Sequence, residues 1–341
     1  LTATGNKHMI PIANQPILFY GLQQLARVKV HEVGIVLGPI QEGIRDAVGD
    51  GSRFGLSVTY IEQGPPKGLA HAVQCAASYL GEDPFIMYLG DNLLEKGLDP
   101  FVEAFREANA DAVLGVTPVS DPHRFGVIEV SGSKVISIEE KPRRPKSNLA
   151  LVGVYVFSPR IHPVIDWLQK SPRGELEITD AIQAMVDADF RVVFQRVYGW
   201  WKDTGAPDDL LEANDLVLNS MNPDQFQRLG SVDVHARVVG PVAIGPDSVV
   251  EADATIEGPV VIGSNARIAS GTTIGPGTSI GSQVELRGCS IRRSIVLDGT
   301  KVWGAIRLHD SLIGRNADVQ GHGPKDREIS LVIGDTSRIR F

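Results

Sequence analysis

Cysteine is scarce in this sequence: only Cys75 and Cys289 occur among 341 residues, and they lie far apart. A disulfide framework or a zinc site needs more ligand residues at regular spacing, so neither is expected. Long hydrophobic runs are missing too, because no run of 18 apolar residues occurs and no transmembrane helix is predicted. Residues 1–7 lack the apolar segment and cleavage site of a signal peptide. The sequence therefore predicts a cytoplasmic protein with no membrane partner.

An excess of positive charge is also absent. The chain has 33 Lys and Arg against 41 Asp and Glu, a net charge of −8. Binding to a nucleic-acid backbone depends on a basic surface, so nucleic acid is not an expected partner. A phosphorylated substrate would instead need local Lys, Arg or a metal ion to offset the charge of the protein. With 43% hydrophobic residues, the chain is long enough for two domains with separate cores.

Residues 1 to about 222 alternate short apolar runs with amphipathic segments. The apolar runs are bounded by Gly, Pro, Asp or Asn, as is typical of strands that are buried on both faces; they are 33–37, 58–61, 85–89 and 112–116. Helical spacing appears in 69–80 and 101–108, and 127–138 has the pattern of a β-hairpin. This order predicts an α/β domain over 1–222, with a Rossmann-like, mostly parallel mixed sheet and helices on both faces.

A six-residue repeat replaces this pattern in the second part of the chain. Aliphatic residues occupy every sixth position without a miss: Ile244, Val250, Ile256, Ile262, Ile268, Ile274, Ile280 and Leu286. Neither an α-helix nor an alternating strand maintains this period. It predicts a parallel β-helix over 231–341, in which each hexad forms one flat side and the aliphatic anchors stack in the interior. The repeat resembles left-handed hexapeptide helices and becomes irregular near Gly288.

Two carboxylates follow predicted strands. Asp91 comes after the apolar run 85–89, at the carboxyl end of a buried strand, where open α/β sheets place their ligand crevices. Asp203, in Trp-Lys-Asp-Thr-Gly, stands at another junction of strand and turn. Together they are candidate ligands of one Mg²⁺, which prefers oxygen ligands and usually keeps substrate phosphates among them. The structural alternative for Asp91 is a carboxylate that caps the next turn.

Three further segments are weak indications of a binding site when each is considered alone. The loop 64–68 leads into a predicted helix, whose first backbone N–H groups could face an anion or a base, although a Gly-Pro loop before a helix is common. Lys7 lies near the start of the chain and Lys141 at the end of the predicted hairpin, and an isolated lysine is usually a solvated surface charge.

The order of these motifs is more specific than any one of them. The segments are 6–16 (Asn-Lys-His-Met-Ile-Pro-Ile-Ala-Asn-Gln-Pro), 63–70 (Gln-Gly-Pro-Pro-Lys-Gly-Leu-Ala), 90–92 (Gly-Asp-Asn), 125–127 (Phe-Gly-Val), 140–142 (Glu-Lys-Pro), 174–180 (Gly-Glu-Leu-Glu-Ile-Thr-Asp) and 201–205 (Trp-Lys-Asp-Thr-Gly). In sequence and order they resemble the glucose-1-phosphate thymidylyltransferase family. The resemblance covers almost all of residues 1–220, and the hexad region is similar to that of the long forms of the family.

The resemblance implies a role for each matching residue. Lys7 is expected to contact the nucleotide phosphates, and Gln63 with Gly68 to bind the pyrimidine. Asp91 and Asp203 are expected to hold Mg²⁺, and Lys141 to bind the sugar phosphate. The remaining expected sugar-pocket residues are Asn92, Gly126, Glu140, Val152 and Gly153. His8 and Lys202 stand where close relatives often carry Gln and Leu, which bears on substrate preference and leaves the metal pair intact.

The resemblance also predicts a difference at the front of the chain. The family opens with a first strand and a glycine-rich loop of the form Gly-Gly-x-Gly-Thr-Arg-Leu-x-Pro-Leu-Thr, whose backbone N–H groups would cradle the triphosphate. Only its last two residues, Leu1-Thr2, are present. We therefore expect the first strand and this loop to be missing from the sequence, and the chain as given to bind nucleotide poorly and to be inactive.

The implied reaction transfers a nucleotidyl group from dTTP or UTP to a sugar 1-phosphate, in the first instance glucose 1-phosphate, with release of pyrophosphate. Both triphosphates remain candidates, because a recess for the thymine methyl is worth only about 1–3 kcal/mol. We expect the enzyme to be a homo-oligomer. Its reaction needs positioning and charge stabilisation but no covalent nucleophile. One alternative is an acyltransferase that uses His235, His309 or His322 of the hexad region. The other is a catalytically silent regulatory subunit.

Overall fold

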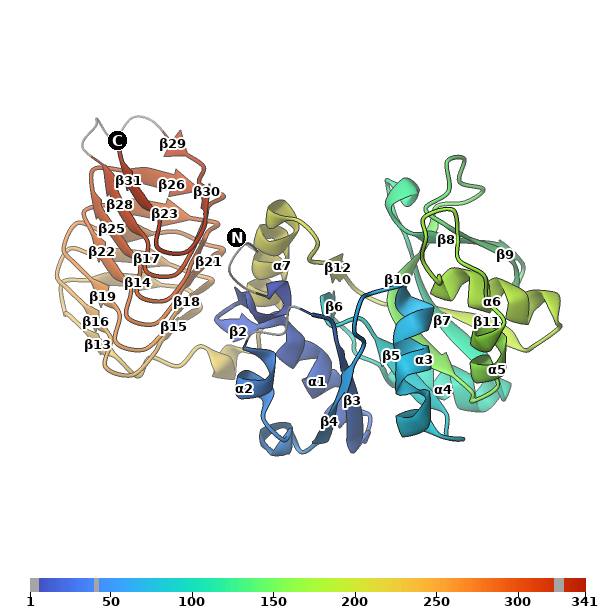
Figure 1. Ribbon diagram of the computed structural model, residues 1–341. Helices are drawn as coiled ribbons and strands as arrows, with labels where there is room; N and C mark the ends of the chain where they lie inside the picture. Colours follow the sequence, from blue (N-terminus) through green and yellow to red (C-terminus); the bar gives the residue numbers. More distant parts are fainter. Residues whose placement is uncertain (1–5, 40–42, 322–327) are drawn as a thin grey trace. The chain divides into compact units, whose positions relative to one another are not determined.

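The computed structural model describes residues 6–39, 43–321 and 328–341 (Figure 1). Leu1-Thr2, the remnant of the expected phosphate loop, lies outside the described residues. The chain forms two compact units: one is Leu18–Asp203, and the other combines the chain up to Ile17 with Thr204–Phe341. In the part of the chain that the structure describes, no helix has the length and apolar character needed to cross a membrane.

A mixed six-stranded sheet forms the centre of the unit Leu18–Asp203. Its order is β11-β7-β10-β8-β9, with β5 paired to β10. The strands are β5 (Phe85–Tyr88), β7 (Ala112–Pro118), β8 (Gly126–Ser131), β9 (Lys134–Glu140), β10 (Leu149–Phe157) and β11 (Val192–Arg196). The mixed character and the 127–138 hairpin are as expected. Fewer pairings are parallel than expected, because β10 lies antiparallel between β5 and β7.

Two shorter ladders complete the strands of this unit. β3 (Glu32–Leu37) and β4 (Ser57–Glu62) form a parallel pair, and β6 (Asn92–Leu94) pairs antiparallel with β12 (Trp201–Asp203). Within the described ranges, β3 has only β4 as a neighbour and β5 has only β10, so each has one open edge.

Helices cover the sheet through apolar stripes. The buried faces of α3 and α6 share one core with β7, β9 and β10. The helices expected at 69–80 and 101–108 are present as α3 and α4. The helical segments are α1 (Ile17–Arg27), α2 (Ile44–Val48), α3 (Leu69–Leu80), α4 (Asp99–Ala108), α5 (Ile161–Asp166), α6 (Ile178–Asp187) and the 3₁₀ turns η2 (Ser52–Phe54) and η3 (Pro122–Arg124).

The hexad region is a parallel β-solenoid, whose coils each contribute one strand to each of three sheets (Figure 1). The first sheet contains β13 (Ser231–Val232), β16 (Val249–Val250), β19 (Arg267–Ile268), β22 (Glu285–Arg287), β25 (Lys301–Gly304), β28 (Asp318–Gly321) and β31 (Arg338–Arg340). The second contains β14 (Arg237–Val239), β17 (Thr255–Glu257), β20 (Thr273–Ile274), β23 (Ser290–Arg292), β26 (Arg307–His309) and β29 (Glu328–Ile329). The third contains β15 (Val242–Ile244), β18 (Val260–Ile262), β21 (Thr278–Ile280), β24 (Ile295–Val296), β27 (Leu312–Ile313) and β30 (Val332–Ile333).

The aliphatic anchors fill the interior of the solenoid, as the period predicts. Ile256, Ile268, Ile274 and Ile280 are fully buried in one continuous cluster. Stacking continues through the irregular stretch near Gly288, because Ile274 pairs with Ile291 in the next coil. The solenoid is therefore stabilised by burial of a column of methyl groups.

The N-terminal segment and helix α7 (Pro207–Ser220) pack with the solenoid. The connection is the fully buried Asn214, whose Oδ1 accepts hydrogen bonds from the Ala13 N–H (2.9 Å) and the Ser279 hydroxyl (2.6 Å). Its Nδ2 donates to the Gly277 carbonyl at 3.0 Å. Every polar atom of this amide side chain is thus satisfied, as burial requires. The segment it holds contains η1 (Lys7–Met9), β1 (Pro11–Ile12) and β2 (Gln15–Pro16), and η4 (Pro223–Gln225) follows α7. The ranges 1–222 and 231–341 remain a prediction about domain boundaries.

We expect Ile268→Asp to destabilise the solenoid strongly, because an unpaired carboxylate would replace a fully buried anchor. A loss of several kcal/mol would lower the melting temperature by about 10 °C in a chain of this size. Val249→Asp is the matched control, since Val249 is 44% exposed and the neighbouring Val250 pairs with Ile268. Equal melting temperatures for the two variants in a thermal scan would contradict the assignment of the interior.

Candidate active site

The ladder between β6 and β12 brings the two predicted metal ligands to neighbouring positions. Asp203 is the last residue of β12, and its Cα pairs with that of Asn92 at the start of β6. Asp91 immediately precedes Asn92, in the turn that follows β5. Sequence alone left open whether these carboxylates meet, and the antiparallel pairing places Asp203 opposite the residue that follows Asp91. Their side chains belong to one compact unit.

The side chain of Asn92, only 3% exposed, joins the two strands. Its Nδ2 donates to Asp91 Oδ1 at 3.1 Å, and its Oδ1 accepts from the indole Nε1 of Trp201 at 2.6 Å. The Asn92 carbonyl accepts the hydroxyl of Tyr88 at 2.7 Å. Burial, and secondarily the charge of Asp91, raises the pKa of Tyr88, so this phenol stays a donor. Asn92 thereby fixes the Asp91 carboxylate and the register of β12.

A turn before β12 fixes where that strand begins. The Glu95 N–H donates to the Trp200 carbonyl, and the Trp200 N–H donates back to Glu95 Oε2, both at 3.1 Å. Gly199 has a φ of +77°, and a Cβ there would collide with the Glu95 carboxylate. Only glycine suits this turn, because it combines a left-handed backbone with a close side-chain contact.

Gly126 and Glu140 lie opposite each other where β8 and β9 pair. A Cβ on Gly126 would lie 3.1 Å from Glu140 Oε2 and 2.8 Å from Cγ2 of Thr179, so glycine leaves room for this carboxylate. The Thr179 hydroxyl donates to Glu140 Oε2 at 3.4 Å. Burial, and secondarily the charge of Glu177, raises the pKa of Glu140. The structure thus holds a largely buried carboxylate at the place predicted to bind sugar.

Glu177, whose charge helps to raise the pKa of Glu140, forms an ion pair with Arg173. Arg173 Nη1 lies 3.0 Å from Glu177 Oε1 and 3.5 Å from Glu140 Oε1, so one guanidinium bridges both carboxylates. Glu177 is 4% exposed and also accepts the Ser171 hydroxyl at 3.0 Å. Glu177 and Thr179 were given no role from sequence, although the 174–180 motif that contains them was recognised. The 174–180 motif was the signal in the sequence from which the two residues could have been identified.

Gly153 and Val152 lie in an irregular stretch of β10, where the register shifts between Leu151 and Tyr155. Gly153 has a φ of +70°, and a Cβ there would lie 3.0 Å from Asn92 Nδ2. The structure therefore places Gly153 against the amide that joins the carboxylate strands. Val152 is fully buried and directs a methyl group toward Gly115, so only its backbone can border a sugar pocket.

Lys141 follows Glu140 in a left-handed conformation, with a φ of +44°. Its N–H donates to the Phe125 carbonyl at 3.0 Å, which anchors the turn next to Gly126. Lys7 lies in the other compact unit, in η1, where the Asn6 side chain accepts the N–H of His8.

The loop before α3 approaches the 174–180 segment closely. Gly68 has a φ of +105°, and a Cβ there would lie 2.8 Å from the Leu176 nitrogen. Leu176 donates its N–H to the Lys67 carbonyl at 2.6 Å and accepts from the Ala70 N–H at 3.0 Å. The Nε2 of Gln63 donates to the Gly68 carbonyl at 3.2 Å. The two residues expected to bind the base are therefore in contact.

Asp91 and Asp203 can supply two oxygen ligands to a divalent cation. Among the described residues, no group of three or more His, Cys, Asp or Glu is arranged to hold a metal. A pair of carboxylates suits Mg²⁺, which takes its remaining ligands from water and substrate phosphates.

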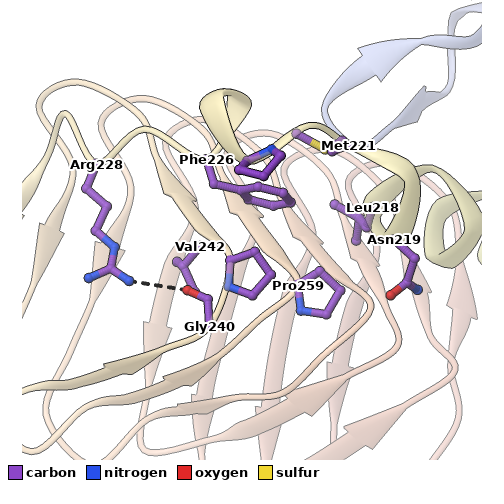
Figure 2. A pocket seen from close by; sticks show the side chains of 10 residues that line it. Leu218, Asn219, Met221, Phe226, Arg228, Gly240, Val242 and Pro259 are labelled. Atoms are coloured by element: carbon purple, nitrogen blue, oxygen red, sulfur yellow. Dashed lines mark hydrogen bonds between the residues drawn. The ribbon is translucent and has the colours of Figure 1, made fainter.

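A cavity of about 400 Å³ lies elsewhere, where α7 leads into the solenoid (Figure 2). It is lined mainly by apolar side chains such as Leu218 and Phe226, and Arg228 Nη2 donates to the Gly240 carbonyl at 3.4 Å. None of the predicted site residues lines it. Since its lining contains no carboxylate, this cavity does not offer the oxygen ligands that the predicted Mg²⁺ site needs.

The histidines of the acyltransferase alternative have local partners or are exposed. His309 Nδ1 lies 3.0 Å from Asp310 Oδ2, and His235 is exposed. His322 lies outside the described residues.

Comparison with known proteins identifies the family of this chain. The sequence pattern of the nucleotidyl transferase family matches residues 1–220, and the pattern described as the GMPPB C-terminal domain matches residues 256–339. The chain is 43% identical to a glucose-1-phosphate thymidylyltransferase of Streptomyces antibioticus, over 100% of this chain and 95% of that protein. The chain belongs to the nucleotidyl transferase family. The predicted membership of the glucose-1-phosphate thymidylyltransferase family is confirmed, and the protein is a sugar nucleotidyltransferase.

Further relatives support the same family and fold. A low-salt glycan biosynthesis nucleotidyltransferase of Haloferax volcanii is 41% identical, over 100% of this chain and 96% of that protein. A solved structure of a candidate glucose-1-phosphate thymidylyltransferase from Bacillus anthracis, in complex with sucrose, is 33% identical with a TM-score of 0.61, and covers 65% of this chain and 89% of its own. The nucleotidyltransferase therefore has the Rossmann-like fold that was predicted, followed by a parallel β-solenoid.

We expect Glu140→Gln to stabilise the nucleotidyltransferase at about pH 8. The folded pKa of Glu140 is raised, so the native state binds more protons than the unfolded state between the two pKa values, and stability falls as pH rises through this window. The amide removes that loss, so the melting temperature of the variant should exceed that of the wild type at about pH 8. The two should converge below about pH 4, near the unfolded pKa of Glu.

Glu139→Gln is the control, because Glu139 is the exposed neighbour on the same strand. If both variants showed the same melting curves across this pH range, burial of Glu140 would not be the source of the effect.

Proposed function

We propose that the enzyme transfers a nucleotidyl group from dTTP or UTP to a sugar 1-phosphate, in the first instance glucose 1-phosphate, and releases pyrophosphate. The observation that supports this proposal is the pairing of Asp203 with Asn92, the residue that directly follows Asp91 in the turn after β5. The names of the Streptomyces antibioticus and Streptomyces griseus relatives, both glucose-1-phosphate thymidylyltransferases, support the choice of substrates.

In this reaction a phosphate oxygen of the sugar phosphate attacks the α-phosphorus of the triphosphate. The bond from that phosphorus to the bridging oxygen breaks, and pyrophosphate leaves with the electron pair. When bound, Mg²⁺ would neutralise charge on the crowded phosphate oxygens. Asp91 and Asp203 would hold it, while Lys7 and Lys141 would bind the nucleotide and sugar phosphates. Positioning and charge stabilisation then suffice, and no covalent intermediate forms.

The surrounding pockets divide recognition between the two substrates. Glu140, Gly126, Asn92 and Gly153 would border the sugar, and a buried carboxylate is a strong acceptor for hydroxyl groups. Gln63 and Gly68 would bind the pyrimidine.

The triphosphate cradle remains an expectation from the resemblance to the family. We propose that a further strand fits between the open edges of β3 and β5, and that the loop after it supplies the N–H groups.

We expect Asp91→Asn and Asp203→Asn each to lower turnover by at least about a hundredfold in a catalytically competent form of the enzyme, because each removes a charge that would hold the metal. Melting temperatures should change little, since the amide keeps the shape of the side chain. Turnover is measured as pyrophosphate release with dTTP and glucose 1-phosphate. Asp83→Asn is the control, since Asp83 is an exposed carboxylate just before β5. Near-normal turnover of either site variant in Mg²⁺ would contradict the shared-metal assignment.

A further inference from the structure

A closed set of contacts surrounds the side chain of Gln63. Gln63 follows β4, and His71 lies in the first turn of α3, three residues after Gly68. The Nε2 of Gln63 lies 3.2 Å from the Gly68 carbonyl oxygen and 3.3 Å from His71 Nδ1. Both neighbours are on the amino side of the amide.

These contacts determine which way the amide points. A carbonyl oxygen only accepts hydrogen bonds, so the Gly68 carbonyl requires the NH₂ group of Gln63 to face it. The second N–H of that group then donates to His71 Nδ1, which accepts only when it carries no proton. Burial, and secondarily the charge of Lys67, lowers the pKa of His71, which favours the neutral ring.

The far side of the imidazole completes the arrangement. With Nδ1 as acceptor, the proton of the neutral ring is on Nε2, which lies 3.6 Å from Cys75 Sγ. The Cys75 thiol in turn donates to the backbone carbonyl of Gln63, with a distance of 3.9 Å from sulfur to oxygen. Each donor in this ring thus has an acceptor.

The arrangement leaves the oxygen of the amide for a ligand. Among the described residues, no donor is bonded to Gln63 Oε1, while both hydrogens of Nε2 have partners. Uracil and thymine carry a donor at N3, whereas cytosine carries an acceptor at the same position. Gln63 Oε1 can therefore accept the N3–H of uracil or thymine, whereas it repels the acceptor N3 of cytosine.

We propose that His71 is a positioning residue that holds the Gln63 amide with its oxygen toward the base, so that the pocket selects pyrimidines with an N3–H over cytosine. The proposal rests on the proposed function, in which Gln63 binds the base. His71 acts through Gln63 and does not itself touch the substrate. A turned amide would place Oε1 against the Gly68 carbonyl, and the neutral His71 in its present tautomer would then have no hydrogen bond to Gln63.

The test compares kcat and KM for dTTP, UTP and CTP in a catalytically competent form of the enzyme. His71→Phe keeps a flat ring but removes the acceptor. We expect its KM for dTTP to rise about tenfold and its preference for dTTP over CTP to fall about tenfold, with kcat for dTTP nearly unchanged. His71→Leu provides a second variant if the phenyl ring disturbs folding, and a thermal scan checks each. Ser78→Ala, an exposed position on the same helix, is the control and should behave as the wild type.

The outcomes separate this inference from the proposed function. Loss of the preference in Gln63→Ala, together with its retention in folded His71→Phe and His71→Leu, would overturn the role of His71 and leave the base site in place. An unchanged preference in Gln63→Ala would instead show that the base binds elsewhere. A parallel fall in kcat for all three triphosphates in the His71 variants would indicate a structural role and would also overturn the proposal.

Discussion

The buried amide of Asn92 is the constraint on which the proposed metal site depends. At 3% exposure its polar atoms must find partners inside the protein, and they find them on Asp91 and Trp201. A slip of β12 by one residue would break the indole bond and turn Asp203 to the other face of the ladder. Gly153 is part of the same constraint, because a side chain there would occupy the space that the amide uses. One side chain thus places one carboxylate directly and the other through strand register.

The 174–180 segment contacts both regions that we propose to bind the substrates. Leu176 holds the loop of Gly68 through its backbone, and Glu177 with Thr179 surrounds Glu140. The loop that we propose to bind the nucleotide and the pocket that we propose to bind the sugar therefore share the 174–180 segment as a common wall. The close approach of Glu140 to Glu177 opposes folding, because like charges in a buried site repel. The Arg173 guanidinium offsets part of that repulsion. Carboxylates whose pKa is shifted by burial and by neighbouring charges are common at functional sites.

Sequence predicted the parts of the fold that depend on local period. Ile256, Ile268 and Ile274 were assigned to a solenoid interior because no other regular structure keeps a six-residue period, and all three are buried. The antiparallel direction of β10 was not predicted, since a uniformly apolar strand carries no local mark of its partners. The carboxylates were identified from their positions after strands, but their proximity depends on a pairing across more than a hundred residues. The contacts of His71 with Gln63 were not predicted either, because they depend on the turn that begins α3.

Binding of Mn²⁺ as a substitute for Mg²⁺ tests the shared metal site most directly. Titration of a catalytically competent form with Mn²⁺ in the presence of nucleotide, followed by electron paramagnetic resonance, counts the ions bound and reports their affinity. The account predicts one tight site per chain in the wild type, and its loss in Asp91→Asn and in Asp203→Asn alike. A tight site that persisted when either carboxylate was replaced would contradict the claim that the two residues hold one ion.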